Sequence, residues 1–510
     1  MYYFLNDNMQ FSKSGIEQSE INRLHLFEKH QISAKIVTRV FAMDLTNVLK
    51  DAKIDRKNFV NLFEYFCGSS DVESRPFMLN DFPLPANTTT TRKDNQLQVF
   101  AQGKMLMIIY FRGNTEEISN VQYFDINGRT VSMVWWDVRG FKCLEQFFDW
   151  DGKISQELYS GPDGRVHIEK NHYLNRAGKE SLSWRVLNYK KSDWVFAGMN
   201  ELTRFFYDEL NALDDHNVYI CDRTVECDWA LFHMHTPAFK VLHLHNDHVS
   251  DPSDMINSPL NNNYTNALNN WAQWDAVISS TPEQSKDVED RFGTDIPAFT
   301  IPVGYVTDDE IAEKHQDFAS RQKGLVVHVA RLAPEKQQNH SIEAFAEIHK
   351  QFPDARLELW GYANGDIEKK FKQQVMDAGL TDVVLFKGYT NNIAAVYDRA
   401  EIGVLPSRAE GFSLTLLEAQ SHGVPMIAND VKYGPSDIIQ DGQTGMLTED
   451  GHPEQLAAGL IKLLGDQELL EQYSDAAYEN AKRYSEDAVF EKWQELIDYF
   501  DSLIHEKAAV

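Results

Sequence analysis

The chain has 510 residues, and at roughly 150 residues per domain this length suggests about three domains. Hydrophobic residues make up 43% and charged residues 25%, which is ordinary for a globular protein and excludes wholesale disorder. Acidic residues (77) exceed basic ones (49), so the formal net charge is −28. Because nucleic acid and anionic bilayers both require concentrated Lys and Arg, a chain this acidic is a poor candidate for binding either.

The first residues, the apolar runs and the cysteines indicate the cellular compartment. The first residues lack a basic segment followed by a long apolar stretch, so no signal peptide is expected. The longest apolar run, 105–111, is far shorter than the ~20 residues that a membrane span needs. Four cysteines without CxxC spacing favour a reducing compartment. We therefore predict a soluble, cytoplasmic protein, in which any membrane contact is peripheral.

The first 65 or so residues follow an α/β pattern. Apolar strands are predicted at 2–5 and 34–38, with a helix between them. The sequence Ser14-Gly15-Ile16-Glu17 fits the S-x-x-E capping box, which predicts where that helix begins.

From about 75 to 190 the hydrophobic period drops to two. Short alternating runs are separated by Asn127-Gly128, Asp151-Gly152 and Asp163-Gly164, and such pairs supply the positive φ that tight hairpins require. This pattern predicts a β-rich insertion.

The α/β pattern returns after about 190 and continues to the end of the chain. Pro302 and Gly304 mark a predicted linker, and 485–505 has the spacing of a long amphipathic helix. The predicted strands are 218–221, 241–244, 276–279, 325–329, 357–360, 383–386, 402–405 and 426–428. Strands that alternate with helices pair in parallel through right-handed crossovers, which predicts doubly wound sheets with a cleft at their carboxyl ends.

The predicted organisation is therefore an α/β fold of two Rossmann-like domains that face a cleft. The predicted parts are an N-terminal acceptor-side domain (1–70 and 191–305), the β-rich insertion (71–190), a C-terminal nucleotide-sugar domain (306–484) and a C-terminal helix packed on the body (485–510).

Two acidic residues follow the predicted strand 402–405. Glu410 is placed in the strand-to-helix loop at the cleft edge, and Glu418 one or two turns inside the helix. Carboxylates at these two places can hold hydroxyls at different points along one ligand. The backbone N–H groups from Phe412 to Leu414 would face a phosphate at the positive end of the helix. Solvated surface carboxylates are the alternative.

Two basic residues follow the predicted strand 325–329. Arg331 and Lys336 lie in the first βα loop of the second half. A diphosphate leaving group needs fixed positive charge where its negative charge develops, and without a metal an Arg and a Lys supply it. A surface loop with an ion pair from Arg331 to Glu335 is the alternative.

Two further patterns suggest metal sites. The sequence 243–248 fits the H-x-H-x-D-H pattern of metallo-β-lactamase-like hydrolases, whose three imidazoles and carboxylate would bind zinc. That fold does not account for two α/β halves, so we expect no metal site, and we expect His243 to be a core histidine. Asp149-Trp150-Asp151 fits a D-x-D metal motif, but Gly152 follows it directly, which favours a turn.

The two pairs Arg331/Lys336 and Glu410/Glu418 match R-x4-K and E-x7-E motifs. In this order, in matching βα contexts and with His248 upstream, they resemble the retaining GT-B glycosyltransferases of family 4 over nearly the whole chain. The resemblance implies the two-domain GT-B fold with a β-rich insertion in the N-terminal domain.

A narrower resemblance rests on the capping-box sequence, the β-rich insertion, His245 to His248 and Ile301 to Gly304. These features are similar to the accessory Sec glycosyltransferases that begin O-glycosylation of serine-rich adhesins. The stretch 432–437 is instead similar to wall-teichoic-acid α-glycosyltransferases, which carry the same insertion.

The resemblance implies a role for each matching residue. Glu410 would orient the donor sugar and Glu418 would bind the ribose, while Arg331 and Lys336 would hold the diphosphate. His248 would face the sugar near the acceptor. The implied catalytic residues are thus His248, Glu410, Arg331 and Lys336. Further substrate contacts are implied for Ser14, Gly15, His245, Gly361, Gly411, Phe412, Ser413, Leu414 and Glu418. For Gly361, at a strand end, a plain βα loop is the alternative.

The implied activity is transfer of a sugar, with N-acetylglucosamine favoured, from a UDP-sugar to Ser or Thr of a serine-rich adhesin. Anomeric configuration would be retained, UDP would be released, and neither a metal nor a resident cofactor is implied. A teichoic-acid acceptor is the alternative, although a net charge of −28 would repel a polyanionic phosphate polymer. A non-catalytic partner subunit is a second alternative, against which the intact motifs argue. The implied partners are the UDP-sugar, the Ser/Thr-rich protein, and a second copy or a paralogous subunit, with no nucleic acid.

Overall fold

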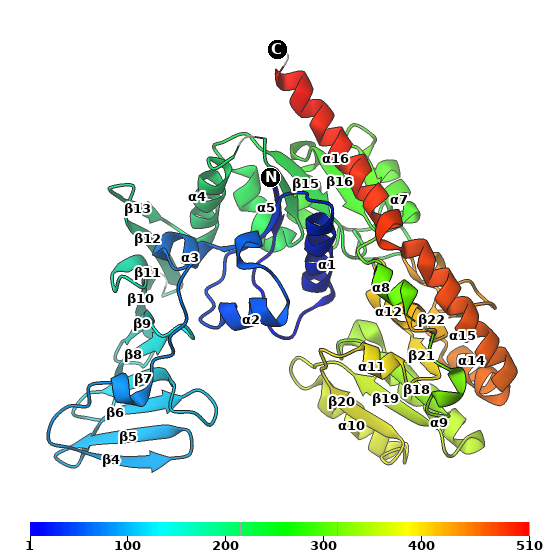
Figure 1. Ribbon diagram of the computed structural model, residues 1–510, viewed down its shortest axis with the longest axis horizontal. Helices are drawn as coiled ribbons and strands as arrows, with labels where there is room; N and C mark the ends of the chain where they lie inside the picture. Colours follow the sequence, from blue (N-terminus) through cyan, green and yellow to red (C-terminus); the bar gives the residue numbers. More distant parts are fainter. Residues whose placement is uncertain (175, 177, 215, 314, 509–510) are drawn as a thin grey trace. The chain divides into compact units, whose positions relative to one another are not determined.

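The computed structural model describes residues 1–174, 176, 178–214, 216–313 and 315–508 (Figure 1). The chain divides into two compact units. The first unit comprises Met1–Phe11 and Ser33–Ala238, and the second unit comprises Ser12–Ile32 and Phe239–Val510.

The first unit begins with short, fully apolar strands. Every residue of β1 and β14 is buried, as expected for strands covered on both faces. Four parallel strands pair in the order β14-β1-β2-β3. They are β1 (Tyr2–Leu5), β2 (Ala34–Thr38), β3 (Phe59–Asn61) and β14 (Val218–Cys221). The helices are α2 (Leu45–Asp51), η1 (Arg56–Asn58), α3 (Leu62–Cys67), η2 (Leu79–Asp81), α4 (Met199–Asn211) and α5 (Thr224–Phe232).

The predicted β-rich insertion is an antiparallel sheet, which has ten strands in the described part of the chain. The strands follow one another in chain order, so that each pairs with its sequence neighbours (Figure 1). They are β4 (Thr88–Lys93), β5 (Gln96–Ala101), β6 (Lys104–Phe111), β7 (Ile118–Phe124), β8 (Thr130–Trp136), β9 (Lys142–Phe148), β10 (Ile154–Ser160), β11 (Val166–Leu174), β12 (Glu180–Tyr189) and β13 (Ser192–Phe196).

The predicted turns of this sheet are present. Gly128, Gly152 and Gly164 all have positive φ. The D-x-D sequence closes one of these hairpins, because the Asp149 carboxylate accepts the N–H groups of Asp151 and Lys153 at 2.9 and 3.0 Å. The prediction of a turn at this motif is confirmed.

The second unit opens with α1 (Gly15–Lys29), whose start is the predicted capping box. The N–H of Ile16 donates to Ser14 Oγ at 3.3 Å, and the N–H of Ser14 donates to Glu17 Oε2 at 2.7 Å. Three parallel strands follow along the chain, β15 (Phe239–His243), β16 (Ala276–Ser279) and β17 (Ala298–Thr300). Between and after them lie α6 (Thr265–Asn269), η3 (Trp271–Gln273), α7 (Pro282–Phe292), α8 (Asp308–Ala312) and η4 (Phe318–Ser320).

The rest of the second unit is a parallel sheet, six-stranded in its described residues, with the order β20-β19-β18-β21-β22-β23. The order reverses direction at β18, as in a doubly wound sheet. The strands are β18 (Leu325–Val329), β19 (Arg356–Trp360), β20 (Val384–Gly388), β21 (Ile402–Leu405), β22 (Met426–Asn429) and β23 (Gly445–Thr448).

The helices around this sheet alternate with its strands. They are η5 (Pro334–Lys336), α9 (Gln338–Gln351), α10 (Ile367–Asp377), α11 (Ala394–Tyr397), α12 (Leu414–Ser421), α13 (Pro435–Ile438), α14 (Pro453–Gly465), α15 (Gln467–Ala481), η6 (Lys482–Tyr484) and α16 (Glu486–Ala508). α16 is the predicted amphipathic helix, and its Val489, Trp493, Leu496 and Phe500 are all buried.

The predicted α/β fold with a β-rich insertion is confirmed, while the four domain boundaries remain predictions. In the described residues we find no helix that combines the length and the apolar character needed to span a bilayer.

Candidate functional site

The structure joins the two sequence motifs through one ion pair. Lys336 ends η5, in the loop that follows β18, and Glu410 lies in the loop that follows β21. Parallel strands bring such loops to the same edge of the sheet. Lys336 Nζ lies 2.7 Å from Glu410 Oε1, and the Glu410 side chain is only 7% exposed. The predicted cation and carboxylate therefore meet at the carboxyl edge of the sheet.

Arg331 lies in the same loop as Lys336 but has a different partner. Its guanidinium forms an ion pair with Glu335, and both side chains are exposed. Thus the local ion pair expected as the alternative is present. Gly361 packs against the start of this loop, since its φ is +143° and a Cβ there would lie 2.0 Å from the Ala330 carbonyl oxygen. Close backbone approach therefore explains this glycine without a ligand.

The predicted helix after Glu410 is α12, and Glu418 lies in its second turn. Phe412 is buried, Ser413 has a left-handed φ of 77°, and the helix begins at Leu414. Glu418 is half-buried, and burial, with a further contribution from the charge of Glu310, raises its pKa to about 7. This carboxyl group is poised to titrate near neutral pH.

Two glycines let other segments pack closely against the loop that carries Glu410. A Cβ on Gly411 would lie 2.1 Å from the His245 carbonyl oxygen. A Cβ on Gly434, where φ is +107°, would lie 2.1 Å from the Phe412 carbonyl oxygen. The segment after β15 and the segment after β22 therefore both touch this loop directly.

His248 lies in the segment after β15, and its side chain is fully buried. Its ring lies near the rings of Phe292 and Tyr433, with centroids 6.3 and 6.4 Å away. Both ring nitrogens are buried. Burial, with the nearby Arg291 charge, lowers the pKa of His248 to about 4, so the imidazole is neutral at neutral pH.

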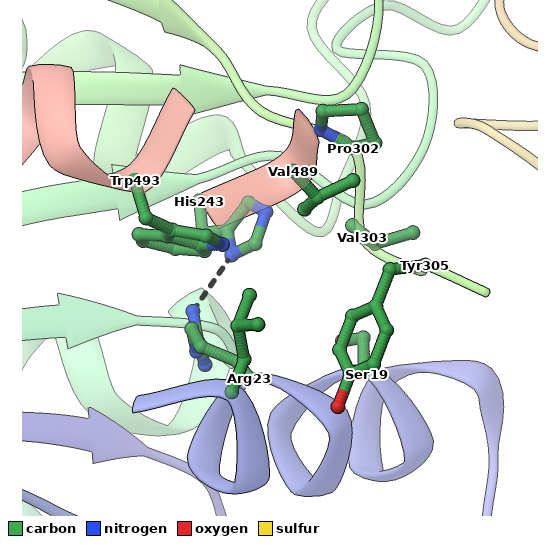
Figure 2. Close-up of a pocket in the computed structure, with 9 residues that line it drawn as sticks. Ser19, Arg23, His243, Pro302, Val303, Tyr305, Val489 and Trp493 are labelled. Carbon is green, nitrogen blue, oxygen red and sulfur yellow. Dashed lines mark hydrogen bonds between the residues drawn. The ribbon is translucent and has the colours of Figure 1, made fainter. Parts of the chain in front are cut away.

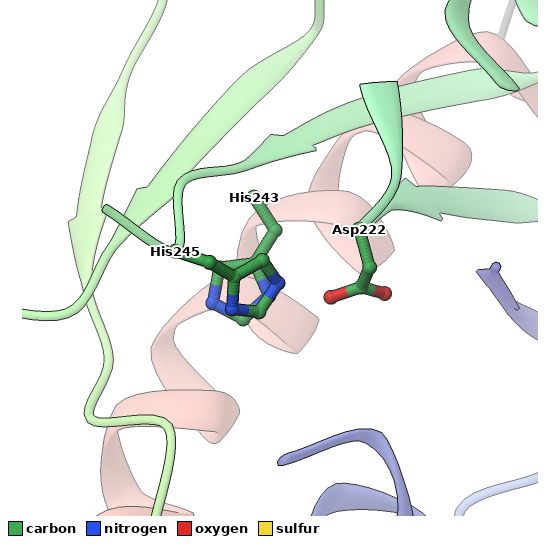
Figure 3. Close-up of side chains that lie close together, drawn as sticks. All are labelled: Asp222, His243 and His245. Carbon is green, nitrogen blue, oxygen red and sulfur yellow. The ribbon is translucent and has the colours of Figure 1, made fainter. Parts of the chain in front are cut away.

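His245 and His243 lie side by side, with ring centroids 4.2 Å apart (Figure 3). The N–H of His245 donates to the Tyr264 hydroxyl at 2.9 Å. His243 is buried, and its Nδ1 lies 3.1 Å from Arg23 Nη1 beside a small cavity that is also lined by Trp493 (Figure 2). Its cavity volume is about 10 Å³, roughly the space of one water molecule. His243 is therefore a core histidine, as predicted.

The three imidazoles of the alternative zinc site do not come together. In the part of the chain that the structure describes, the ring nitrogens of His243, His245 and His248 do not form a group within 4.8 Å of one another. The H-x-H-x-D-H pattern is therefore not assembled as a three-histidine site.

The capping-box loop at the start of α1 lies beside the segment that follows β20. The N–H of Lys13 donates to the Tyr389 hydroxyl at 3.2 Å. Next to it, Ser14 caps the helix, and a Cβ on Gly15 would meet nothing within 4 Å. The space around Gly15 is open, so packing within the protein does not explain this glycine.

A buried cluster of polar side chains next to Glu410 is not among the substrate contacts that the resemblance implies. Asp247 is 4% exposed, and its Oδ1 has no hydrogen-bond partner in the described residues. Burial and the charge of Glu410 raise the pKa of Asp247 to about 7. Nearby, Asp287 accepts from Lys432 Nζ at 2.9 Å and from the Tyr433 hydroxyl at 2.8 Å. The sequence signal for Asp247 was its place between His245 and His248.

Comparisons with known proteins show what the chain is similar to. Residues 310–480 match the family described as Glycosyl transferases group 1. The chain is 24% identical to the poly(glycerol-phosphate) alpha-glucosyltransferase of Bacillus subtilis, over 96% of this chain and 74% of that protein. It is also 24% identical to the UDP-N-acetylglucosamine–peptide N-acetylglucosaminyltransferase GtfA subunit of Streptococcus pneumoniae, over 97% of this chain and 98% of that protein.

Two solved structures show the same fold. The pneumococcal O-GlcNAc transferase GtfA, solved in complex with UDP and GlcNAc, superposes with a TM-score of 0.85 at 22% identity, covering 98% of each chain. TarM superposes with a TM-score of 0.81 at 22% identity, covering 97% of this chain and 98% of TarM. The resemblance expected from the motifs is confirmed: the chain is a glycosyltransferase that carries a group 1 domain and has the GT-B fold.

Proposed function

We propose that this chain transfers a sugar from a UDP-sugar to Ser or Thr of a serine-rich protein, with retention of anomeric configuration. The observation that carries this proposal is the 2.7 Å ion pair between Lys336 and Glu410, because it unites the two motifs at one edge of the sheet. A cation for a diphosphate and a carboxylate for a sugar hydroxyl can act on one donor only if they lie at the same edge of the sheet.

Donor binding would exchange the partners of these side chains. The diphosphate would attract Lys336 away from Glu410 and Arg331 away from Glu335, because phosphate oxygens offer both cations charge-assisted hydrogen bonds. Glu410, freed from Lys336, would accept a hydrogen bond from a sugar hydroxyl. Glu418 would hold the ribose, and the backbone N–H groups at the start of α12 would face the phosphates.

The bond from the sugar to the leaving diphosphate would break as the acceptor hydroxyl attacks from the same face. The leaving phosphate would accept the proton of that hydroxyl, so atoms and charge balance without a separate base. Lys336 and Arg331 would stabilise the negative charge that develops on the diphosphate. We therefore propose turnover that does not depend on a metal ion.

The proposed acceptor is a protein. The name of the pneumococcal relative gives a peptide acceptor, and the name of the Bacillus relative gives poly(glycerol-phosphate). A net charge of −28 favours the neutral, Ser-rich chain, because it opposes the approach of a polyanion. A teichoic-acid acceptor is the second candidate, supported by the teichoic-acid-like stretch 432–437 and by the Bacillus relative.

The pneumococcal relative is named a subunit. We propose that this chain likewise acts with a second copy or a paralogous subunit. The β4–β13 sheet would then extend the acceptor groove or form the contact between subunits.

The experiment is UDP release from UDP-GlcNAc or UDP-glucose, with a Ser-rich peptide or poly(glycerol phosphate) as acceptor, with and without a chelator. We expect release with the peptide and a product mass increased by one sugar, unchanged by the chelator. Release only with the polymer would select the second candidate. No release with either sugar or acceptor, from the chain alone or with a paralogous subunit, would contradict both.

A further inference from the structure

One carboxyl group beside Glu410 has no function in the steps above. Asp247 lies in the segment that joins β15 to α6, two residues after His245, whose carbonyl oxygen packs against Gly411. Its side chain is 4% exposed, and Oδ1 has no hydrogen-bond partner in the described residues. A buried polar atom without a partner destabilises a fold, so we expect a group from outside the chain, such as a ligand or a water molecule, to bond to it.

The cations near Asp247 are already bound to other carboxylates. Lys432 lies 2.9 Å from Asp287 Oδ2 and 3.0 Å from Glu283 Oε1, and Lys336 is paired with Glu410. Burial and the charge of Glu410 both raise the pKa of Asp247, and the charge of Lys432 lowers it by less than either. Within the described residues, Asp247 is therefore not one half of an ion pair.

Asp287 shows what a structural carboxylate in this part of the molecule looks like. Its Oδ2 accepts from both Lys432 and the Tyr433 hydroxyl. Asp247 is more deeply buried than Asp287, whose side chain is 14% exposed. Nevertheless, Asp247 Oδ1 has no hydrogen-bond partner among the described residues. Asp287 is thus a carboxylate that stabilises the fold, whereas Asp247 has an oxygen available to bind a ligand.

The charge around Asp247 limits what that ligand can be. An anionic group would be repelled by Glu410, and Asp247 offers no positive charge that would attract it. A neutral hydroxyl both donates and accepts, and it would satisfy Oδ1 without changing the charge of the site. The sugar of the donor supplies such groups next to Glu410.

We propose that Asp247 is a sugar-binding residue, whose carboxyl group hydrogen-bonds a hydroxyl of the transferred sugar beside Glu410. This inference rests on the proposed function. It assigns the segment 245–248 a direct contact with the donor sugar. In the proposed function, the diphosphate is held by the loop after β18, and the ribose is held by α12, which follows β21.

The test compares Asp247→Asn with a control at a buried carboxylate whose partners are all within the protein. Glu358 on β19 is such a group, because it is 4% exposed and forms an ion pair with Arg399. For each variant we would measure kcat and KM for the UDP-sugar, the Kd for UDP by calorimetry, and the Tm.

For Asp247→Asn we expect kcat/KM to fall about 10- to 100-fold, the range for a lost hydrogen bond to a buried carboxylate. The Kd for UDP would stay within about twofold and the Tm would not fall, because the ligand contact is to the sugar and no bond within the fold is lost. Glu358→Gln would do the opposite, lowering the Tm while leaving kcat/KM unchanged.

Wild-type kcat/KM in Asp247→Asn would overturn the inference and leave the proposed function standing. A parallel loss of UDP affinity and of Tm would also overturn it, since that pattern indicates a structural role. No turnover by the wild-type protein with any UDP-sugar would overturn the proposed function and this inference together.

Discussion

Two loops of the second unit meet at the candidate site, and they satisfy their polar groups in different ways. In the loop after β21, Glu410 is paired with Lys336 at 2.7 Å. In the segment after β15, Asn246 Oδ1 and Asp247 Oδ1 have no hydrogen-bond partner within the described chain. The difference teaches that one side of the site can neutralise its charges within the protein while the other side leaves polar groups for a ligand.

The largest effect is expected from breaking the paired side. Lys336→Ala or Glu410→Gln should lower kcat by about 10²–10³-fold, because each removes a charged contact that strengthens in the transition state. UDP release under saturating donor measures this loss. The matched control is Glu347→Gln, which breaks a Lys–Glu pair of similar length, 2.6 Å, on the exposed face of α9. Near-wild-type turnover in both site variants would show that the pocket is elsewhere.

The contact between the two loops can be broken without removing a charge. Gly411→Ala places a Cβ 2.1 Å from the His245 carbonyl oxygen, so one of the two backbones must move. We expect the free energy of unfolding to fall by about 2 kcal/mol, as for other overpacked sites, together with a loss of turnover. Denaturant unfolding measures the first effect. Gly198→Ala is the control, since a Cβ there meets nothing within 4 Å. Equal stability of the two variants would contradict the close contact.

A smaller effect is expected from pH. The pKa of Glu418 is raised to about 7 from its ordinary value of 4.5, so the folded protein holds this proton more tightly than the unfolded chain. The contribution of Glu418 to the free energy of unfolding therefore decreases as the pH rises from 4.5 to about 7, and is constant above.

The same titration should appear in nucleotide binding. Ionised Glu418 accepts the ribose hydroxyls more strongly than the neutral acid, so UDP affinity should rise about tenfold as the pH increases through the pKa. Calorimetry at several pH values measures this change in UDP affinity. In Glu418→Gln this rise should disappear, and an unchanged pH profile would remove Glu418 from the ribose site.

The smallest effect is expected at the start of α1. Ser14→Ala removes the side-chain acceptor of the capping box, and we expect a loss of about 1 kcal/mol in the free energy of unfolding. Thermal or denaturant unfolding measures it. Ser14→Asp, which keeps a capping oxygen, should retain wild-type stability, and equal destabilisation by both would indicate that the cap is not the cause.

Much of the fold could be predicted from local pattern. The strands at 2–5, 34–38 and 325–329 have the predicted bounds, because each is a short apolar run between clear turn or helix signals. The three-residue β3 and the four-residue β23 were not predicted, since runs this short have too little periodicity to separate them from loops.

The candidate site could be predicted only in part. Arg331, Lys336, Glu410 and Glu418 were found because they follow strands of one sheet at fixed spacing, and parallel strands bring such positions to one edge. The burial of His248 under Tyr433, and the lack of a partner for Asp247 Oδ1 in the described residues, depend on segments far apart in sequence. No local pattern contains that information.

The most direct test of the central claim is a crystal structure of the protein with UDP. We predict that the diphosphate oxygens bind Lys336 and Arg331, that Glu418 binds the ribose, and that Lys336 no longer pairs with Glu410. UDP bound elsewhere, with the ion pair between Lys336 and Glu410 intact, would contradict the account.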